Sequence, residues 1–225
     1  MKPDLSLVIP AYNEEKRLER SLTGAVEYLS ENEYSYEVIV VDDGSRDKTA
    51  EVAENFNGEN LEVRRGMLAA KGYKRIFSDA DFSTPIYELP KILNSLNIGF
   101  DVCIGSRAVD FSMIKEHQPF YREFMGKTFN RIVQTLVIKG VKDTQCGFKG
   151  FTDRAAEDLF SKAKINGFGF DVEILYLANL HGFKVDEVSV EWYNDDRSTV
   201  NPIVDSTKML LEIFRVRSLH KNHKP

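Results

Sequence analysis

The strongest constraint on the fold of this chain is a regular alternation of short apolar runs with amphipathic stretches. Apolar runs with many β-branched residues predict buried strands, and they lie at 5–9, 37–41, 76–77 and 102–104. Stretches with helical spacing of apolar residues predict helices at 14–29, 47–56 and 85–96. Ser83 or Thr84 is expected to cap the last of these, with Pro85 in its first turn. This alternation predicts an α/β fold in which helices flank a mostly parallel central sheet.

No repeat, low-complexity segment or linker interrupts the pattern, so we expect a single domain over 1–225. The net charge of −5 argues against a nucleic acid partner. The start of the chain does not resemble a signal peptide, and no apolar run is long enough to span a membrane. Any work at a membrane is therefore expected at its surface. The two cysteines, Cys103 and Cys146, predict a reducing compartment and no disulfide.

The stretch after Val63 does not fit the alternation. A crossover between parallel strands needs about a dozen or more residues, but only eleven separate Val63 from Arg75. The helical part of this stretch, RRGMLAAKG, gives barely two turns. Either the connection is unusual or a segment is missing from the sequence between Val63 and Arg65, and we favour the second interpretation.

Acidic residues follow three of the predicted strands, at the sheet edge where ligands of parallel sheets bind. The carboxylates are Glu14, Asp42, Asp43, Asp79 and Asp81. They would repel one another in a dry cleft, and they favour a divalent cation and sugar hydroxyls as ligands. An extended D-x-D places Asp79 and Asp81 on one face, which suits Mg²⁺ or Mn²⁺. For Asp42, a simple strand-to-helix turn with Asp47 as the cap is an equal alternative.

Five motifs follow one another along the chain: VIPAYNEEKRL, EVIVVDDGSRDKT, FSDADFS, CIGSR and VKDTQCGFKGF. In this order they resemble the inverting nucleotide-sugar glycosyltransferases of family 2, which have the GT-A fold. The dolichyl-phosphate glucosyltransferase and mannosyltransferase branch is most similar. The glucosyltransferase side is favoured by DTQCGFK at 143–149, FDVEILY at 170–176 and VEW at 190–192. The resemblance extends from Leu5 to about Arg217, and its departure is the short connection, which keeps only RRGM of a Gly- and basic-rich loop.

The resemblance implies roles for the residues of the donor site. Pro10, Tyr12 and Glu14 would line the nucleoside pocket. Asp43 would accept a hydrogen bond from the base, with Asp42 as its support. Three regions are implied within the one domain: a donor-binding half over about 1–107, an acceptor-binding half over about 108–204 and a basic amphipathic segment over about 205–225.

The resemblance also implies a metal site and a sugar pocket. Asp79 and Asp81 would bind Mg²⁺ or Mn²⁺, with Ser83 as a further contact, and the metal would stabilise the leaving nucleotide. The sugar pocket would contain Gln145, Cys146 and Gly147. For Cys146, plain packing of a small residue is the more favoured alternative. Glucose from a UDP-sugar is the first choice of donor, and mannose from a GDP-sugar is the second.

The expected acceptor is a polyprenyl or dolichyl phosphate. Asp171 is the positional candidate for a general base, but a phosphate monoester has a second pKa near 6 and is largely dianionic at pH 7. Such an acceptor needs positive charge more than a base, so Arg107, Arg122 and Arg197 are predicted to form a cationic cradle. Asp171 and Glu173 would then orient these groups or bind sugar hydroxyls.

Two segments suggest contact with a membrane surface. Residues 121–138 carry an apolar stripe at helical spacing. Residues 208–225 contain five Lys or Arg against one acid, with an apolar face of Met209, Leu210, Ile213 and Phe214. A basic amphipathic helix is typical of a peripheral protein, here expected in the cytoplasm at the inner face of the cell membrane. The alternative is that both helices pack on the core or on a second subunit; the sequence does not predict the oligomeric state.

Three hypotheses follow from these patterns. The first is a metal-dependent enzyme that transfers a hexose from a nucleotide diphosphate to a polyprenyl phosphate. The second keeps this donor but uses a soluble or polysaccharide acceptor. The third is a catalytically silent nucleotide-sugar-binding protein, and the presence of both Asp79 and Asp81 counts against it.

Overall fold

The computed structural model describes residues 2–54, 63–116, 119–138, 140–165, 167, 169–194 and 204–221. In this part of the chain a six-stranded sheet has the order β2-β1-β3-β5-β4-β6. The strands are β1 Leu5–Ala11, β2 Tyr36–Asp42, β3 Lys74–Ser78, β4 Val102–Ser106, β5 Phe148–Thr152 and β6 Val185–Ser189. Only β5 is antiparallel to its neighbours among these described strands. The predicted α/β fold with a mostly parallel sheet is confirmed.

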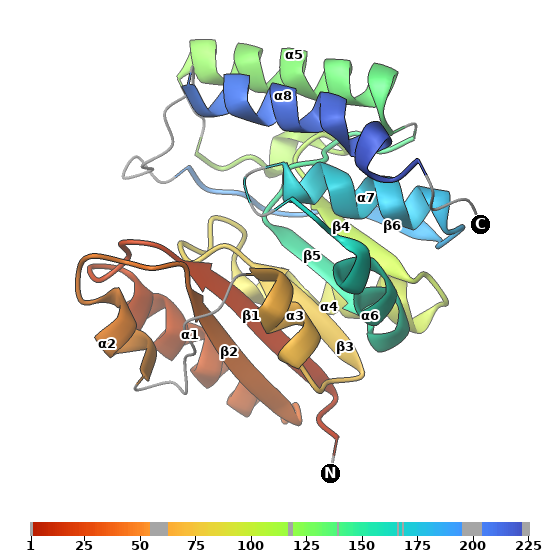
Figure 1. The fold of residues 1–225 in the computed structure, drawn as a ribbon. Helices are drawn as coiled ribbons and strands as arrows, with labels where there is room; N and C mark the ends of the chain where they lie inside the picture. Colours follow the sequence, from red (N-terminus) through yellow and green to blue (C-terminus); the bar gives the residue numbers. More distant parts are fainter. Residues whose placement is uncertain are drawn as a thin grey trace.

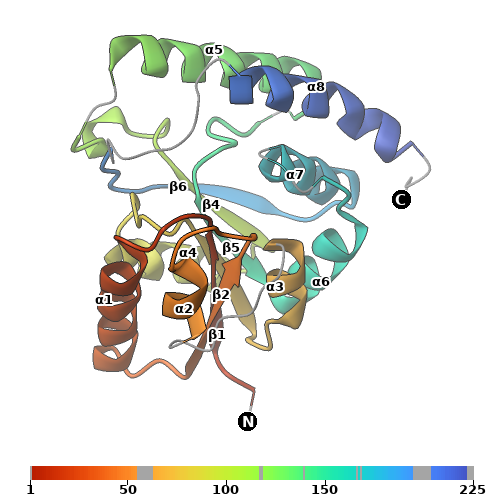
Figure 2. The same cartoon turned by 60° about the vertical axis from the view of Figure 1, so that its left-hand side comes forward.

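Helices cover both faces of this sheet. They are α1 Leu18–Glu31, α2 Thr49–Glu54, α3 Val63–Ala69, α4 Leu89–Asn97, α5 Phe120–Leu136, α6 Asp153–Lys162, α7 Phe170–Leu180 and α8 Val204–Leu219, with short 3₁₀ turns η1 Ile86–Glu88 and η2 Phe111–Met113. Helices α3 and α6 pack on one face, and α1 and α4 lie on the other (Figure 1). Helices α5 and α8 lie side by side beyond the carboxyl ends of the parallel strands (Figures 1 and 2).

Burial explains why these elements form where they do. In β1, Leu5, Leu7, Val8 and Ile9 are all buried, as expected for a strand covered on both faces. In α1, the buried side chains recur at helical spacing, namely Leu18, Leu22, Ala25 and Leu29. Helix α3 packs very closely on the sheet at Gly66, where a Cβ would lie 2.4 Å from Val41 Cγ2.

Three expected helix starts differ from the structure, and the helix expected from residue 47 begins at Thr49. The first helix begins at Leu18 rather than Glu14, because Glu14 O accepts the amides of both Arg17 and Leu18 in a turn. The helix expected over 85–96 is divided into η1 and α4, and Pro85 precedes η1 without a side-chain cap. The prediction that Ser83 or Thr84 caps it is wrong. Thr84 is buried instead, with its Oγ1 3.8 Å from Cys146 Sγ.

The short connection is also corrected. Val63 is the first residue of α3 and not the end of a strand. The crossover from β2 to β3 therefore extends from Asp43 to Tyr73 and contains both α2 and α3. It is long enough to place β3 beside β1. The strand end assumed at Val63 is therefore wrong, whereas the missing segment stays a prediction.

Candidate active site

Two loops at the carboxyl ends of β1 and β2 are joined by hydrogen bonds. The Asn13 amide donates to Ser45 Oγ at 2.9 Å, and the Glu14 amide donates to Thr49 Oγ1 at 2.6 Å. Asn13 has a left-handed conformation with φ of 56°, which asparagine adopts more readily than most residues. These contacts hold the two loops in one arrangement beside the end of the sheet.

The residues predicted to meet a nucleoside lie on and beside these loops. Asp42 is buried and accepts hydrogen bonds from the Ser45 amide at 3.2 Å and from the Ser45 hydroxyl, so it stabilises the turn. Asp43 is exposed beside it, Tyr12 is exposed on the other loop, and Pro10 is partly buried within β1. The structure thus presents Tyr12 and Asp43 to solvent and supports them through Asp42.

Glu14 is brought close to Asp81 by a residue that the sequence did not single out. The Arg17 guanidinium donates to both carboxylate oxygens of Glu14 through Nε and Nη2. Its Nη1 lies 3.9 Å from Asp81 Oδ2. Arg17 therefore connects a predicted nucleoside contact to a predicted metal ligand.

The D-x-D segment is a turn, and the expected extended conformation is wrong. Asp79 directly follows β3, and its carbonyl oxygen accepts the Phe82 amide at 3.1 Å. Phe82 has a φ of 47°, in the left-handed region. The Ser83 amide donates to Asp81 Oδ1 at 2.9 Å, so Ser83 orients Asp81 through its backbone. Both carboxylates nevertheless remain near enough to influence each other's charge.

Asp79 is a carboxylate without a hydrogen-bond donor in the described part of the chain. Loss of water contacts, followed by repulsion from Asp81 and Asp171, raises its pKa to about 7. Lys149 and Arg107 oppose this rise but do not cancel it. As a whole residue Asp79 is exposed at the surface, so a cation from solvent can reach it. A cation between Asp79 and Asp81 would relieve that repulsion.

Gly147 lies directly against Asp79. The Asp79 amide donates to Gly147 O at 3.0 Å, and a Cβ at residue 147 would lie 1.7 Å from Asp79 Oδ2. Only glycine leaves room for the carboxylate in this position. Its neighbour Cys146 is buried, and burial raises the pKa of the thiol to about 11, as suits a packing residue.

The chemistry of these residues suits a hard cation with few protein ligands. Among the described residues, no three or more His, Cys, Asp or Glu side chains are arranged as a ready-made metal site. A metal here would therefore use Asp79 and Asp81 and take its other ligands from water and phosphate. Mg²⁺ is commonly bound in this way, through one or two carboxylates together with substrate phosphates.

Asp171 is held by a buried lysine that the sequence analysis also missed. Lys149 Nζ lies 2.5 Å from Asp171 Oδ1 and donates to Cys146 O at 2.5 Å. The Lys149 side chain is 2% exposed, so this ion pair is out of bulk water. Burial raises the pKa of Asp171, although Lys149 opposes this. The ion pair engages the carboxylate that was the candidate base.

Arg107 follows β4 and pairs with the buried Asp143. Its Nε lies 2.7 Å from Asp143 Oδ2 and its Nη2 lies 2.8 Å from Oδ1, a bidentate arrangement. Burial alone would raise the pKa of Asp143, but the charge and hydrogen bonds of Arg107 outweigh burial and lower it to about 2. The guanidinium carbon lies 5.4 Å from the centre of the Trp192 ring. Arg107 is therefore fixed in orientation.

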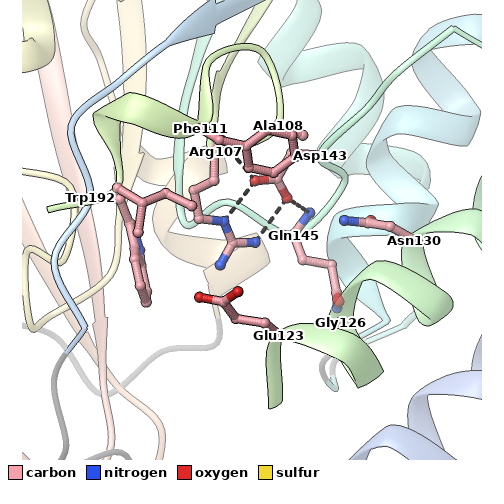
Figure 3. A pocket seen from close by; sticks show the side chains of 10 residues that line it. Arg107, Ala108, Phe111, Glu123, Gly126, Asn130, Asp143, Gln145 and Trp192 are labelled. Carbon is pink, nitrogen blue, oxygen red and sulfur yellow. Dashed lines mark hydrogen bonds and ion pairs between the residues drawn. The ribbon is translucent and has the colours of Figure 1, made fainter. Parts of the chain in front are cut away.

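A cavity of about 100 Å³ lies beside Arg107. Figure 3 shows Arg107 between Trp192 and Gln145, with Glu123 of α5 below the guanidinium. The wall combines charged and polar groups with an apolar side, and its residues include Arg107, Phe111, Ile114, Glu123, Asn130 and Trp192. Gln145 connects this cavity to α8, since its Nε2 lies 2.7 Å from Met209 Sδ.

The predictions for the other residues of the acceptor side have different outcomes. Glu173 is fully buried, and its carboxylate accepts the amides of Lys164 and Ile165 and contacts His220 Nε2 at 2.6 Å. The prediction that Glu173 binds sugar hydroxyls or orients the cradle is therefore wrong. The side chain of Arg122 and the whole of Arg197 lie outside the described residues.

Comparison with known proteins shows the family to which the chain belongs. The sequence model described as Glycosyl transferase family 2 matches residues 6–160. A dolichyl-phosphate beta-glucosyltransferase of Dictyostelium discoideum is 35% identical over 243 aligned positions, which cover 95% of this chain and 73% of that protein. The human dolichyl-phosphate beta-glucosyltransferase is 32% identical, with 95% and 74% covered. Both alignments are longer than the chain, so the relatives contain residues within the matched region that this chain lacks.

Solved structures share the fold at much lower sequence identity. Glucosyl-3-phosphoglycerate synthase from Mycobacterium tuberculosis, in complex with phosphoglyceric acid, has a TM-score of 0.70 at 16% identity, covering 95% of this chain and 80% of that one. The same enzyme in complex with Mn²⁺, UDP and phosphoglyceric acid has a TM-score of 0.68 at 17% identity, covering 99% and 80%. At this level of identity the likeness concerns the fold alone.

Proposed function

The chain belongs to glycosyl transferase family 2 and is a glycosyltransferase, and we propose that it transfers glucose from UDP-glucose to dolichyl or another polyprenyl phosphate. The observation that carries this proposal is the pair Asp79 and Asp81 at the carboxyl end of β3, whose carboxylates are near enough to repel each other. The names of the curated relatives support the sugar and the acceptor.

The donor would lie across the loops that follow β1, β2 and β3. Tyr12 and Asp43 are exposed where a uracil ring could stack and hydrogen-bond. Asp79 and Asp81 would hold Mg²⁺ or Mn²⁺, which when bound supplies Lewis-acid stabilisation of the leaving diphosphate. Gly147 keeps the Asp79 carboxylate in its position.

The acceptor side fits a nucleophile that needs no general base. A polyprenyl phosphate is already largely dianionic at neutral pH. Arg107 provides fixed positive charge beside the cavity, because Asp143 and Trp192 define its orientation. Asp171 is engaged by Lys149, which suits a positioning role better than proton transfer. Arg122 and Arg197 stay proposed members of the same cradle.

We also propose that α8 contacts the membrane surface. Its predicted apolar face is corrected, because Met209 and Ile213 are buried in the protein. The outer face instead exposes apolar side chains together with basic ones, namely Leu211, Phe214, Leu219, Lys208, Arg215, Arg217 and Lys221. No described acidic side chain is exposed there between 208 and 221. Such a face suits an anionic lipid surface, here the inner face of the cell membrane. No helix in the described part of the chain has both the length and the apolar character needed to cross a bilayer.

Transfer of radiolabel tests the proposed reaction. UDP-[¹⁴C]glucose, dolichyl phosphate and Mn²⁺ or Mg²⁺ are incubated with the full chain, and label is counted in the butanol phase. We expect lipid-linked label that disappears with EDTA and in Asp81→Ala, whose melting temperature should change little because the carboxylate is near the surface. Label only in soluble products would contradict the lipid acceptor. If label is transferred from GDP-[¹⁴C]mannose but not from UDP-[¹⁴C]glucose, the proposed donor is wrong.

A further inference from the structure

Arg17 is a largely buried cation between two acids of the cleft. Its side chain is 13% exposed and that of Asp81 is 19% exposed. Nε and Nη2 donate to Glu14, and Nη1 is the nitrogen that lies 3.9 Å from Asp81 Oδ2. The planar fork of arginine can serve two carboxylates at once, which the ammonium group of lysine does less well.

Arg17 faces one oxygen of Asp81, and the Ser83 amide contacts the other. Asp81 Oδ1 already accepts the Ser83 amide at 2.9 Å. Asp81 Oδ2 is the atom 3.9 Å from Arg17 Nη1. A divalent cation bound to Oδ2 would therefore come close to a positive charge that is held in place by Glu14. The two cations compete for one oxygen.

The structure also contains empty space next to Arg17. A cavity of about 390 Å³ lies beside Arg17, between α1 and η1. Its lining includes Phe82 and Tyr87, together with the basic residues Lys16 and Arg20. A displaced Arg17 guanidinium would have this space available to it.

We propose that Arg17 is a counter-ion for Asp81 in the metal-free enzyme, so that a divalent cation has to displace it and binds well only together with the donor diphosphate. The inference rests on the metal site of the proposed function. The diphosphate brings negative charge that offsets the two neighbouring cations. Metal and nucleotide then increase each other's affinity by the same factor. Arg17 is a positioning residue in this account.

Binding of Mn²⁺ alone tests this, measured from the electron paramagnetic resonance signal of free Mn²⁺ with the full chain. Arg17→Gln is expected to bind Mn²⁺ more tightly than the wild type, by up to roughly fivefold, the upper end of what partly exposed ion pairs contribute. With UDP present the difference should shrink. A merely structural role predicts the opposite sign, because a disordered site binds metal less well.

Two controls test whether the change in Mn²⁺ affinity comes from Arg17 itself. Arg20→Gln removes the same charge from the first turn of α1, at the same cavity, and should leave Mn²⁺ affinity unchanged. Because Arg17→Gln also unpairs Glu14, the substitution is repeated in a Glu14→Gln background, where it should still tighten Mn²⁺ binding. If Arg17→Gln does not fold, Arg17→Lys should give a smaller tightening, since lysine cannot hold Glu14 and face Asp81 together.

The outcomes are distinct. Unchanged or weaker Mn²⁺ binding in folded Arg17→Gln, while the wild type binds, overturns the inference and leaves the metal site standing. Equal tightening in Arg20→Gln, or loss of the effect in the Glu14→Gln background, also overturns it. If the wild type binds no Mn²⁺ even with UDP, the metal site of the proposed function fails and the inference fails with it.

Discussion

Gly147 and Asp79 are in such close contact that one methyl group added at residue 147 would displace the Asp79 carboxylate. In Gly147→Ala the new Cβ would have to push the Asp79 carboxylate aside. A displacement of about 1 Å can lower a rate by roughly a hundredfold. We expect a fall in kcat/KM of that order, with little change in the free energy of unfolding, measured by transfer kinetics and urea denaturation.

Gly24→Ala is the matched control for this substitution. A Cβ at residue 24 has nothing within 4 Å, and the residue lies within α1. Replacing an exposed helical glycine by alanine stabilises by up to about 1 kcal/mol and should not affect transfer. Wild-type kcat/KM in Gly147→Ala would show that the contact with Asp79 does not matter.

The pair of Asp143 and Arg107 predicts a particular response to acid. The pKa of Asp143 in the folded protein, about 2, lies below its ordinary value of 3.8. The pair therefore contributes fully to stability above about pH 4, and this contribution, about 2 kcal/mol, is lost as the pH falls from about 4 to about 2. We expect the free energy of unfolding to decline in this window and the decline to be smaller in Asp143→Asn. Identical slopes in both proteins would contradict this assignment.

At the scale of elements, Glu173 joins three segments. Glu173 lies on α7, and its carboxylate accepts hydrogen bonds from backbone amides at the start of the α6–α7 connection. It also contacts His220, just after α8. In Glu173→Ala the amides of Lys164 and Ile165 lose a buried partner, so we expect the free energy of unfolding to fall by about 3 kcal/mol. Urea denaturation measures this loss, and kcat/KM of the folded fraction should stay near the wild-type value.

Glu51→Ala provides the comparison for Glu173→Ala. Glu51 is an exposed glutamate on α2, and surface substitutions of this kind usually change stability by about 0.5 kcal/mol or less. If the free energy of unfolding falls no more in Glu173→Ala than in Glu51→Ala, Glu173 does not stabilise the packing of α7 and α8. A large fall in kcat/KM without loss of stability would indicate that Glu173 acts in the active-site cleft.

Much of the element pattern was predictable because burial and periodicity leave direct marks in the sequence. The β1 and β2 runs and the apolar stripe of α1 are examples. The crossover after β2 was predicted wrongly, since an apolar residue such as Val63 marks a short helix as readily as the end of a strand. The D-x-D turn was missed because Phe82 has no sequence mark of its left-handed conformation.

The acids of the cleft were predictable, but their cationic partners were not. Asp79 and Asp81 are separated by only one residue in the sequence, whereas Arg17 and Lys149 meet their partners only in the folded chain. Lys149 does leave one signal, a lysine within the buried strand β5. A buried lysine requires a nearby acid, but the sequence does not identify which one.

At the scale of the whole molecule, α5 and α8 lie on the side toward which β1 and β3 direct the acids (Figure 1). A membrane on the outer face of α8 would therefore lie near the acceptor cavity. Replacing both Leu211 and Phe214 by Ser removes two exposed apolar side chains, and we expect binding to phosphatidylglycerol vesicles to weaken at least about tenfold. Vesicle sedimentation measures this, and binding should also weaken with salt.

Ile98→Ser is the control for vesicle binding. Ile98 is 67% exposed but follows α4, away from α8, so its loss should not affect sedimentation. Equal weakening by Ile98→Ser would indicate non-specific adhesion. Vesicle binding that survives loss of both Leu211 and Phe214 would place the membrane contact elsewhere.

The central claim is that Asp79 and Asp81 hold a cation that binds the donor diphosphate. The most direct test is a crystal structure of the protein with manganese and UDP, with data collected near the manganese absorption edge. The account predicts one anomalous peak within bonding distance of both carboxylates and of the diphosphate oxygens. Ordered UDP in the cleft with no anomalous peak between Asp79 and Asp81 would contradict it.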